Sequence, residues 1–152
     1  MLLTRVLHVQ ITRESHKGRE VAVTNPALKF VARINAHDVE GLIGLMAPGH
    51  KFVDSLGVES PRPAIEEGWR RYFAMVPDYW IRVGRTLHDG NRVVLIGKAG
   101  GTFVPPGGIM KAANRWETPA VWVARIEGEK VAEWRVYSDN EPIRQKMRKE
   151  NR

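Results

Sequence analysis

Two long β-rich runs, each turning back on itself at a glycine, constrain the fold of this chain more than any other feature. Residues 78–103 read DYWIRVGRTLHDGNRVVLIGKAGGTF, and the pair Asp89-Gly90 near the middle is a strong hairpin signal. Residues 115–139 repeat the arrangement, with Gly128 at the turn. Consecutive hairpins of this kind pair antiparallel. The second half of the chain is therefore predicted to be an antiparallel meander.

Three helices are predicted ahead of this meander. The first begins with Thr24 or Asn25 as the N-cap and has Pro26 near its first helical position. Asp38 caps a second, short helix, and Pro63 starts a third that carries bulky apolar residues at helical spacing. Helices followed by a meander predict an α+β domain, with the helices on one face of a curved, mainly antiparallel sheet. A sheet curved in this way tends to leave a pocket.

Length and composition predict a single domain. The chain has 152 residues, of which 43% are apolar, enough for one sizeable core. We expect residues 1–24 to be an N-terminal extension, either an edge strand or a disordered arm, residues 25–147 to be the domain, and residues 148–152 to be a basic tail. The first residues lack the apolar stretch of a secretory signal, and no run suits a membrane span. We expect a soluble, cytoplasmic protein.

The net charge of +7 raises the question of a nucleic-acid partner. Most of the excess lies in residues 1–24 and 141–152, a distribution more typical of solvated surfaces than of a binding patch. We therefore expect no nucleic-acid and no membrane partner. The chain has no Cys, and its His residues lack metal-ligand spacing, so neither a metal nor another cofactor is expected.

Several stretches together resemble one known group of proteins. They are FVARINAHDVEGLIGLMAP, FVDSLG, AIEEGWRRYF, VPDYWIRV, GGTF and EKVAEWRVYSD. Over about residues 25–147 the chain resembles the SnoaL-like and ketosteroid-isomerase-like branch of the nuclear transport factor 2 (NTF2-like) superfamily. The resemblance implies a cone-shaped α+β half-barrel with an apolar cavity, often dimeric through the outer sheet face. Members include polyketide cyclases, isomerases and non-catalytic proteins, so the site must decide the chemistry.

Asp54 is the candidate catalytic residue that this resemblance implies. With Gly57 it matches the acid-x-x-Gly pattern in which the steroid isomerase holds its base. The isomerase's two donors to the enolate fall at Phe30 and Val121, neither of which can donate, and losing one donor costs roughly 3 to 4 kcal/mol. The catalytic acid of limonene epoxide hydrolase falls at Val136. The comparison therefore argues against both of these activities.

An apolar cavity is expected around this acid. Two-residue alternation would place Trp134, Val136 and Ser138 on the pocket face of the last strand, although a bulge would reverse that face. In the alternative interpretation, Asp54 is a strand-end acid that only bonds to the loop backbone. The residues expected to line the pocket are Phe30, Trp69, Leu95, Val121, Trp134 and Val136.

Two functions remain open from the sequence. The first is a cofactor-independent enzyme of the cyclase, isomerase or dehydratase type, in which Asp54 removes a proton next to the carbonyl group of a hydrophobic compound. The second is a non-catalytic module in which the same cavity binds a ligand or supports dimerisation. In both, a small hydrophobic molecule is the expected ligand. A second copy of the chain is also expected as a partner, because Trp and Tyr residues occur on both faces of the later strands.

Overall fold

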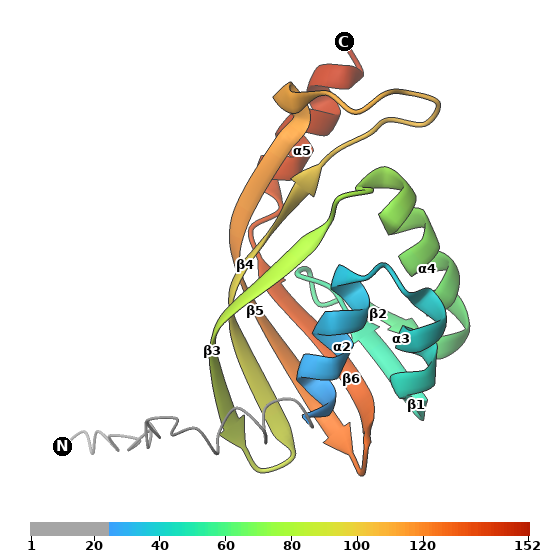
Figure 1. Ribbon diagram of the computed structural model, residues 1–152, viewed down its shortest axis with the longest axis vertical. Coiled ribbons are helices and arrows are strands. Elements are labelled where there is room, and N and C mark those ends of the chain that lie inside the picture. The colour runs from blue at the N-terminus through green and yellow to red at the C-terminus, as the bar shows by residue number, and fades with distance from the viewer. Residues whose placement is uncertain (1–24) are drawn as a thin grey trace, which may run out of the picture.

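The computed structural model describes residues 25–152, in which helices pack against one strongly curved sheet (Figure 1). The expected N-terminal extension, residues 1–24, lies outside the described residues. The helices are α2 (Pro26–Asn35), α3 (Val39–Leu45), α4 (Arg62–Met75) and α5 (Glu141–Glu150), with a short 3-10 helix η1 (Ala112–Asn114). The strands are β1 (Met46–Val53), β2 (Glu59–Pro61), β3 (Trp80–Asp89), β4 (Arg92–Thr102), β5 (Arg115–Glu127) and β6 (Lys130–Ser138).

The strands form one sheet in the order β2-β1-β6-β5-β4-β3. Neighbouring strands pair antiparallel, except β1 and β6, which run parallel. The turns that join β3 to β4 and β5 to β6 contain Gly90 and Gly128, with φ of 58° and 59°. These left-handed values favour glycine, which explains why the two glycines mark the hairpins in the sequence. The predicted α+β class and mainly antiparallel sheet are confirmed.

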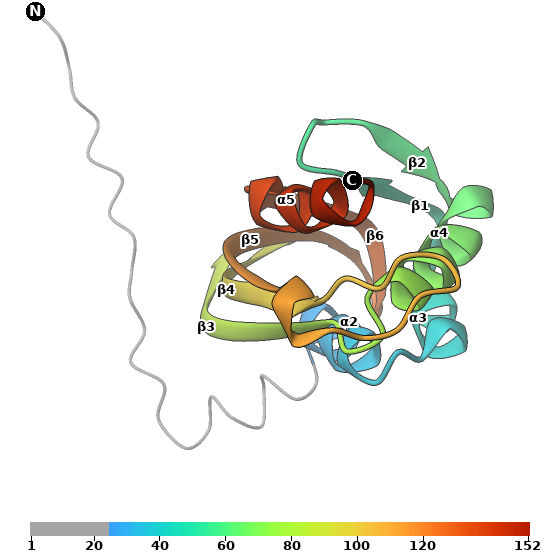
Figure 2. The same cartoon turned by 90° about the horizontal axis from the view of Figure 1, so that it is seen from above.

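Helices α2, α3 and α4 lie on the concave side of the sheet, as the view from above shows (Figure 2). Side chains along β5 alternate in burial. Every second one is buried, and the residues between them are partly or fully exposed. The buried set is Trp116, Thr118, Ala120, Trp122 and Ala124. One face of β5 therefore belongs to the interior and the other to the outer surface.

Capping bonds confirm the predicted starts of α2 and α3, whereas α4 begins at Arg62, one residue before the predicted Pro63, without a side-chain cap. The side chain of Asn25 accepts a hydrogen bond of 2.9 Å from the N–H of Ala27, and Pro26 is the first helical residue. Asp38 caps α3 by accepting the N–H of Gly41 at 2.9 Å. Each cap satisfies an N–H that the first helical turn leaves without a partner.

Helix α5 and strands β1 and β2 complete the fold. Helix α5 adds a fourth helix and runs across residue 147, where the domain was expected to end. Strand β1 begins at Met46 and passes through Pro48, because its register with β6 shifts between Met46 and Lys51 and so tolerates a proline. Strand β2 pairs with the end of β1.

Candidate functional site

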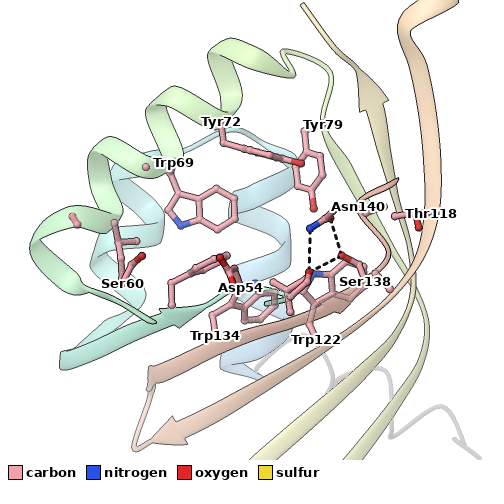
Figure 3. A pocket seen from close by; sticks show the side chains of 18 of the residues that line it. Asp54, Ser60, Trp69, Tyr72, Tyr79, Thr118, Trp122, Trp134, Ser138 and Asn140 are labelled. Atoms are coloured by element: carbon pink, nitrogen blue, oxygen red, sulfur yellow. Dashed lines mark hydrogen bonds between the residues drawn. The ribbon is translucent and has the colours of Figure 1, made fainter. Parts of the chain in front are cut away.

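A cavity of about 320 Å³ lies between α4 and the concave face of the sheet (Figure 3). Helix α4, the turn after β1 and the inward-facing residues of β4, β5 and β6 contribute its walls. Four of the five Trp of the chain line it. A site of this size and aromatic character suits a small, flat, apolar ligand. Its aromatic lining consists of Phe52, Trp69, Tyr72, Tyr79, Trp116, Trp122 and Trp134.

Asp54 directly follows β1, and its side chain lies on the cavity wall near Trp69 in Figure 3. Its Oδ1 atom accepts hydrogen bonds from the backbone N–H groups of Leu56 and Val58, each at 2.9 Å. Among residues 25–152, Oδ2 has no hydrogen-bond partner. The acid therefore anchors the turn with one oxygen and keeps the other unbonded.

The structure brings four of the predicted site residues to the cavity wall: Asp54, Trp69, Trp134 and Val136. Ser138 also lines the cavity, so the alternation of β6 directs residues 134, 136 and 138 inward. The pairing of β6 with β5 stays regular along this part of the strand, so no bulge reverses the two faces there.

Phe30 does not line the cavity. It is fully buried, with its ring centroid 4.6 Å from that of Trp134 and 6.5 Å from that of Trp69. Because both Trp side chains line the cavity, Phe30 supports the wall from behind. A hydroxyl group added to this ring would enter the core rather than the cavity.

Leu95 and Val121 also lie away from the cavity wall. Leu95 is fully buried in the core and pairs with Trp122, which does line the cavity. Val121 lies between Ala120 and Trp122, which both line the cavity, so strand alternation turns Val121 to the outer face of the sheet. The two donor positions that the resemblance located at Phe30 and Val121 are therefore not cavity positions in this chain.

Tyr72 and Tyr79 line the cavity and were not among the predicted site residues. Burial raises the pKa of the Tyr72 phenol well above its usual range. Burial also raises the pKa of Tyr79, and the neighbouring Tyr72 adds to that shift. Both side chains therefore remain protonated and able to donate a hydrogen bond. In the sequence, Tyr72 occupied an ordinary helical core position and Tyr79 directly preceded a strand, so neither position signalled a site.

A polar corner formed by Ser55, Ser138 and Asn140 lines the cavity beside Asp54. The two Ser hydroxyl oxygens are 3.1 Å apart, and the hydroxyl of Ser138 donates to Oδ1 of Asn140 at 3.2 Å. Nδ2 of Asn140 donates to the Ser55 hydroxyl at 3.4 Å, which closes the triangle drawn in Figure 3. The corner ties the turn after β1 to the end of β6 and offers polar atoms near the acid.

Within residues 25–152, no three His, Cys, Asp or Glu side chains converge as a metal site requires. The helices of the same residues are too short or too polar to span a membrane.

Comparison with solved structures finds the same fold in proteins of low sequence identity. A hypothetical protein with a ketosteroid isomerase-like fold from Catenulispora acidiphila, solved in complex with trimethylamine, is 18% identical with a TM-score of 0.67, over 78% of this chain and 88% of that one. A candidate SnoaL-like polyketide cyclase from Shewanella denitrificans is 14% identical with a TM-score of 0.70, over 85% and 98%. AclR, a candidate hydroxylase from Streptomyces galilaeus, is 20% identical with a TM-score of 0.69, over 89% and 98%.

Comparison with curated proteins gives no match. The family model of the SnoaL-like domain matches residues 27–134, which is more than half of the chain. Its match covers the three N-terminal helices and the sheet strands through Trp134. The chain therefore belongs to the SnoaL-like domain family.

Proposed function

We propose that the cavity binds a small hydrophobic carbonyl compound and that Asp54 accepts a proton from the carbon next to its carbonyl group. The position of the Asp54 carboxylate carries this proposal, because it lies on the cavity wall with Oδ1 fixed by two backbone N–H groups. Oδ2 is the oxygen that would take the proton. A fixed base beside an apolar binding surface is the arrangement that removal of such a proton requires.

In the proposed step, the C–H bond next to the carbonyl group breaks and its proton passes to Oδ2 of Asp54. The electron pair of that bond delocalises onto the carbonyl oxygen, which gives an enolate. Where a C=C bond adjoins the deprotonated carbon, the enolate extends over it, and return of the proton to the far carbon of that bond gives an isomer. Alternatively, attack of the enolate carbon on a second carbonyl group of the same molecule closes a ring, and the alkoxide formed takes the proton from Oδ2 of Asp54. All electrons stay within the substrate, so the proposed chemistry is independent of a cofactor.

Ligand binding without turnover is the second candidate function. The bonds from Asp54 to the N–H groups of Leu56 and Val58 favour it, because they give the acid a structural role that needs no chemistry. In that case the aromatic walls would hold a ligand, and the acid would only shape the turn beside it.

Proton exchange into 2-tetralone, a flat two-ring ketone with acidic hydrogens next to its carbonyl group, tests the proposal. The protein in deuterated buffer is expected to speed the uptake of deuterium by the ketone, followed by NMR or mass spectrometry. Asp54→Asn removes the base but keeps an oxygen acceptor for the turn, so it is expected to slow the exchange by roughly two to four orders of magnitude.

The matched control is Asp139→Asn, which changes a nearby acid that is not among the cavity-lining residues. It is expected to leave the exchange rate unchanged. Exchange no faster than in buffer, with 2-tetralone still bound, would favour ligand binding without turnover. Equal rates for the wild-type protein and Asp54→Asn would remove Asp54 from the chemistry.

The proposed assembly is a homodimer through the outer face of the sheet. Ile96, Val121 and Tyr137 stand opposite one another on β4, β5 and β6. Ile96 is 37% exposed and Tyr137 is 52% exposed. An apolar row across the middle of an open sheet face supports contact with a second copy.

A further inference from the structure

Among residues 25–152, the protonated hydroxyl group of Tyr79 has no hydrogen-bond partner. Tyr79 is only 9% exposed, and its ring projects into the cavity in Figure 3. Its pKa is raised by burial and by Tyr72, with no hydrogen bond contributing from the described part of the chain. The hydroxyl oxygen remains accessible from the cavity, so a bound molecule with an oxygen at this position would accept its hydrogen bond.

The backbone around Tyr79 is fixed by side chains from the end of α2. Nε2 of His37 lies 2.8 Å from the carbonyl oxygen of Tyr79, so this ring nitrogen carries the donated hydrogen. The His37 ring stacks on Phe73, with centroids 4.3 Å apart and an angle of 8°. The side chain of Asn35 accepts the N–H of Ile81 at 2.8 Å and donates to its carbonyl at 2.9 Å. The backbone is therefore held at the carbonyl group of Tyr79 and at Ile81, two residues farther along the chain.

The ring of Tyr79 is held by two aromatic neighbours. Tyr72 packs against it edge to face, with centroids 4.9 Å apart at 88°, and Trp116 stacks on it at 6.2 Å and 30°. With the backbone and the ring both restrained, the hydroxyl points in one direction before any ligand arrives. Donors fixed in advance stabilise developing negative charge more than mobile donors do.

We infer that the Tyr79 hydroxyl donates a hydrogen bond to the carbonyl oxygen of a flat ligand with one or two rings. The class of ligand rests on the proposed function, and its size follows from a cavity of about 320 Å³ walled by Trp side chains. Tyr79 and Asp54 come from different elements that both border this cavity, so the ligand oxygen and the reacting C–H bond have separate protein partners. Tyr79 thereby supplies a donor that Phe30 and Val121 lack.

The experiment compares 2-tetralone with tetralin, which has the same two rings without the oxygen. Because four Trp line the cavity, quenching of Trp fluorescence reports the binding of both probes. Tyr79→Phe keeps the ring and removes only the hydroxyl. We expect it to weaken the binding of 2-tetralone about threefold to tenfold and to leave the binding of tetralin unchanged.

Infrared spectroscopy of bound 2-tetralone gives a second readout that a packing defect would not move. A hydrogen bond lowers the stretching frequency of the carbonyl group, so we expect a lowered frequency in the wild-type complex and a partial return in Tyr79→Phe. Thermal unfolding checks that the variant is folded, and Tyr79→Phe is not expected to lower its stability, because the ring that packs in the wall is kept.

The two other Tyr of the chain provide matched controls. Tyr137→Phe removes an exposed hydroxyl on the outer face of the sheet and is expected to leave the binding of both probes unchanged. Equal weakening of both probes by Tyr79→Phe, or no change in either, would overturn the inference. Loss of the preference for 2-tetralone in Tyr72→Phe but not in Tyr79→Phe would overturn the assignment to Tyr79.

Asp54→Asn separates this inference from the proposed function. It is expected to slow proton exchange by roughly the same two to four orders of magnitude while keeping the preference for 2-tetralone over tetralin, because it leaves the Tyr79 hydroxyl in place. If the wild-type protein fails to catalyse exchange but Tyr79→Phe loses the preference, the proposed chemistry is wrong and the oxygen-binding role of Tyr79 stands.

Discussion

The backbone N–H of Gly57 donates a hydrogen bond of 2.9 Å to the carbonyl oxygen of Asp54. This bond closes a β-turn directly after β1, and Gly57 has a φ of 80°. The Asp54 carboxylate caps the same turn through the N–H groups of Leu56 and Val58. The acid-x-x-Gly spacing therefore encodes the turn that fixes the acid at the edge of the cavity.

Gly57→Ala is expected to lower the free energy of unfolding by about 1 to 2 kcal/mol. An added Cβ would meet no atom within 4 Å, so the cost comes from the left-handed backbone and not from a clash. Gly49→Ala in β1 is the control, because its surroundings are equally open and its backbone is not left-handed. Urea unfolding measures both variants, and an equal loss in the two would show that the φ of Gly57 is not the cause.

Asp54→Asn and Asp54→Ala are expected to differ in stability by about 1 kcal/mol, with the alanine variant less stable. The amide oxygen of Asn can still accept the N–H groups of Leu56 and Val58, whereas Ala leaves both to water. Thermal and urea unfolding measure the difference. An Asn variant as unstable as the Ala variant would mean that the negative charge itself anchors the turn.

The features that depend on local sequence could be predicted, and those that depend on distant contacts could not. Gly90 and Gly128 marked the hairpins because their backbone conformation is decided within the turn. Tyr79 was missed because its position is fixed by His37, a residue 42 positions away in the sequence. Val121 was assigned to the cavity from the resemblance to the steroid isomerase, although the alternation of β5 directs its neighbours Ala120 and Trp122 there.

Phe30→Tyr is expected to destabilise the fold by roughly 1 to 3 kcal/mol and to give no faster proton exchange in 2-tetralone. Phe30 is fully buried behind the cavity wall, so the new hydroxyl would lose its bonds to water without reaching the ligand. Phe52→Tyr is the control, because Phe52 is partly buried and lines the cavity, where a hydroxyl has room. Faster exchange in Phe30→Tyr would mean that this position does reach the ligand.

Stability is expected to fall as the pH drops below 6.5, because of His50. Burial lowers the pKa of His50, opposed by its hydrogen bond of 2.6 Å from Nδ1 to the carbonyl of Val131. Among nearby charges, Arg62 and Arg125 lower this pKa further and Glu133 raises it. The unfolded chain therefore takes up a proton at a higher pH than the folded protein does. The stability that neutral His50 contributes is present above pH 6.5 and is lost toward the lower pKa of the folded state.

Urea unfolding at about pH 7.5 and about pH 5.5 measures this dependence. His50→Gln is expected to reduce the difference in stability between the two pH values, although its stability at the higher pH also falls. His88→Gln, which changes an exposed histidine in β3, is expected to keep the full difference. An unchanged pH dependence in His50→Gln would assign it to other groups.

Ile96→Lys is expected to convert the proposed homodimer into a monomer. Ile96 lies on the outer face of β4, opposite Val121 and in line with Tyr137, so a lysine there would place a charge at one end of the apolar row. Burying that charge against a second copy costs more than leaving it in water. Light scattering at micromolar concentration is expected to give twice 17.2 kDa for the wild-type protein and 17.2 kDa for the variant.

Ile109→Lys is the control, because Ile109 is 72% exposed in the loop between β4 and η1 and lies outside the sheet face. A wild-type mass of 17.2 kDa would refute the dimer, and dissociation by Ile109→Lys would move the interface to that loop.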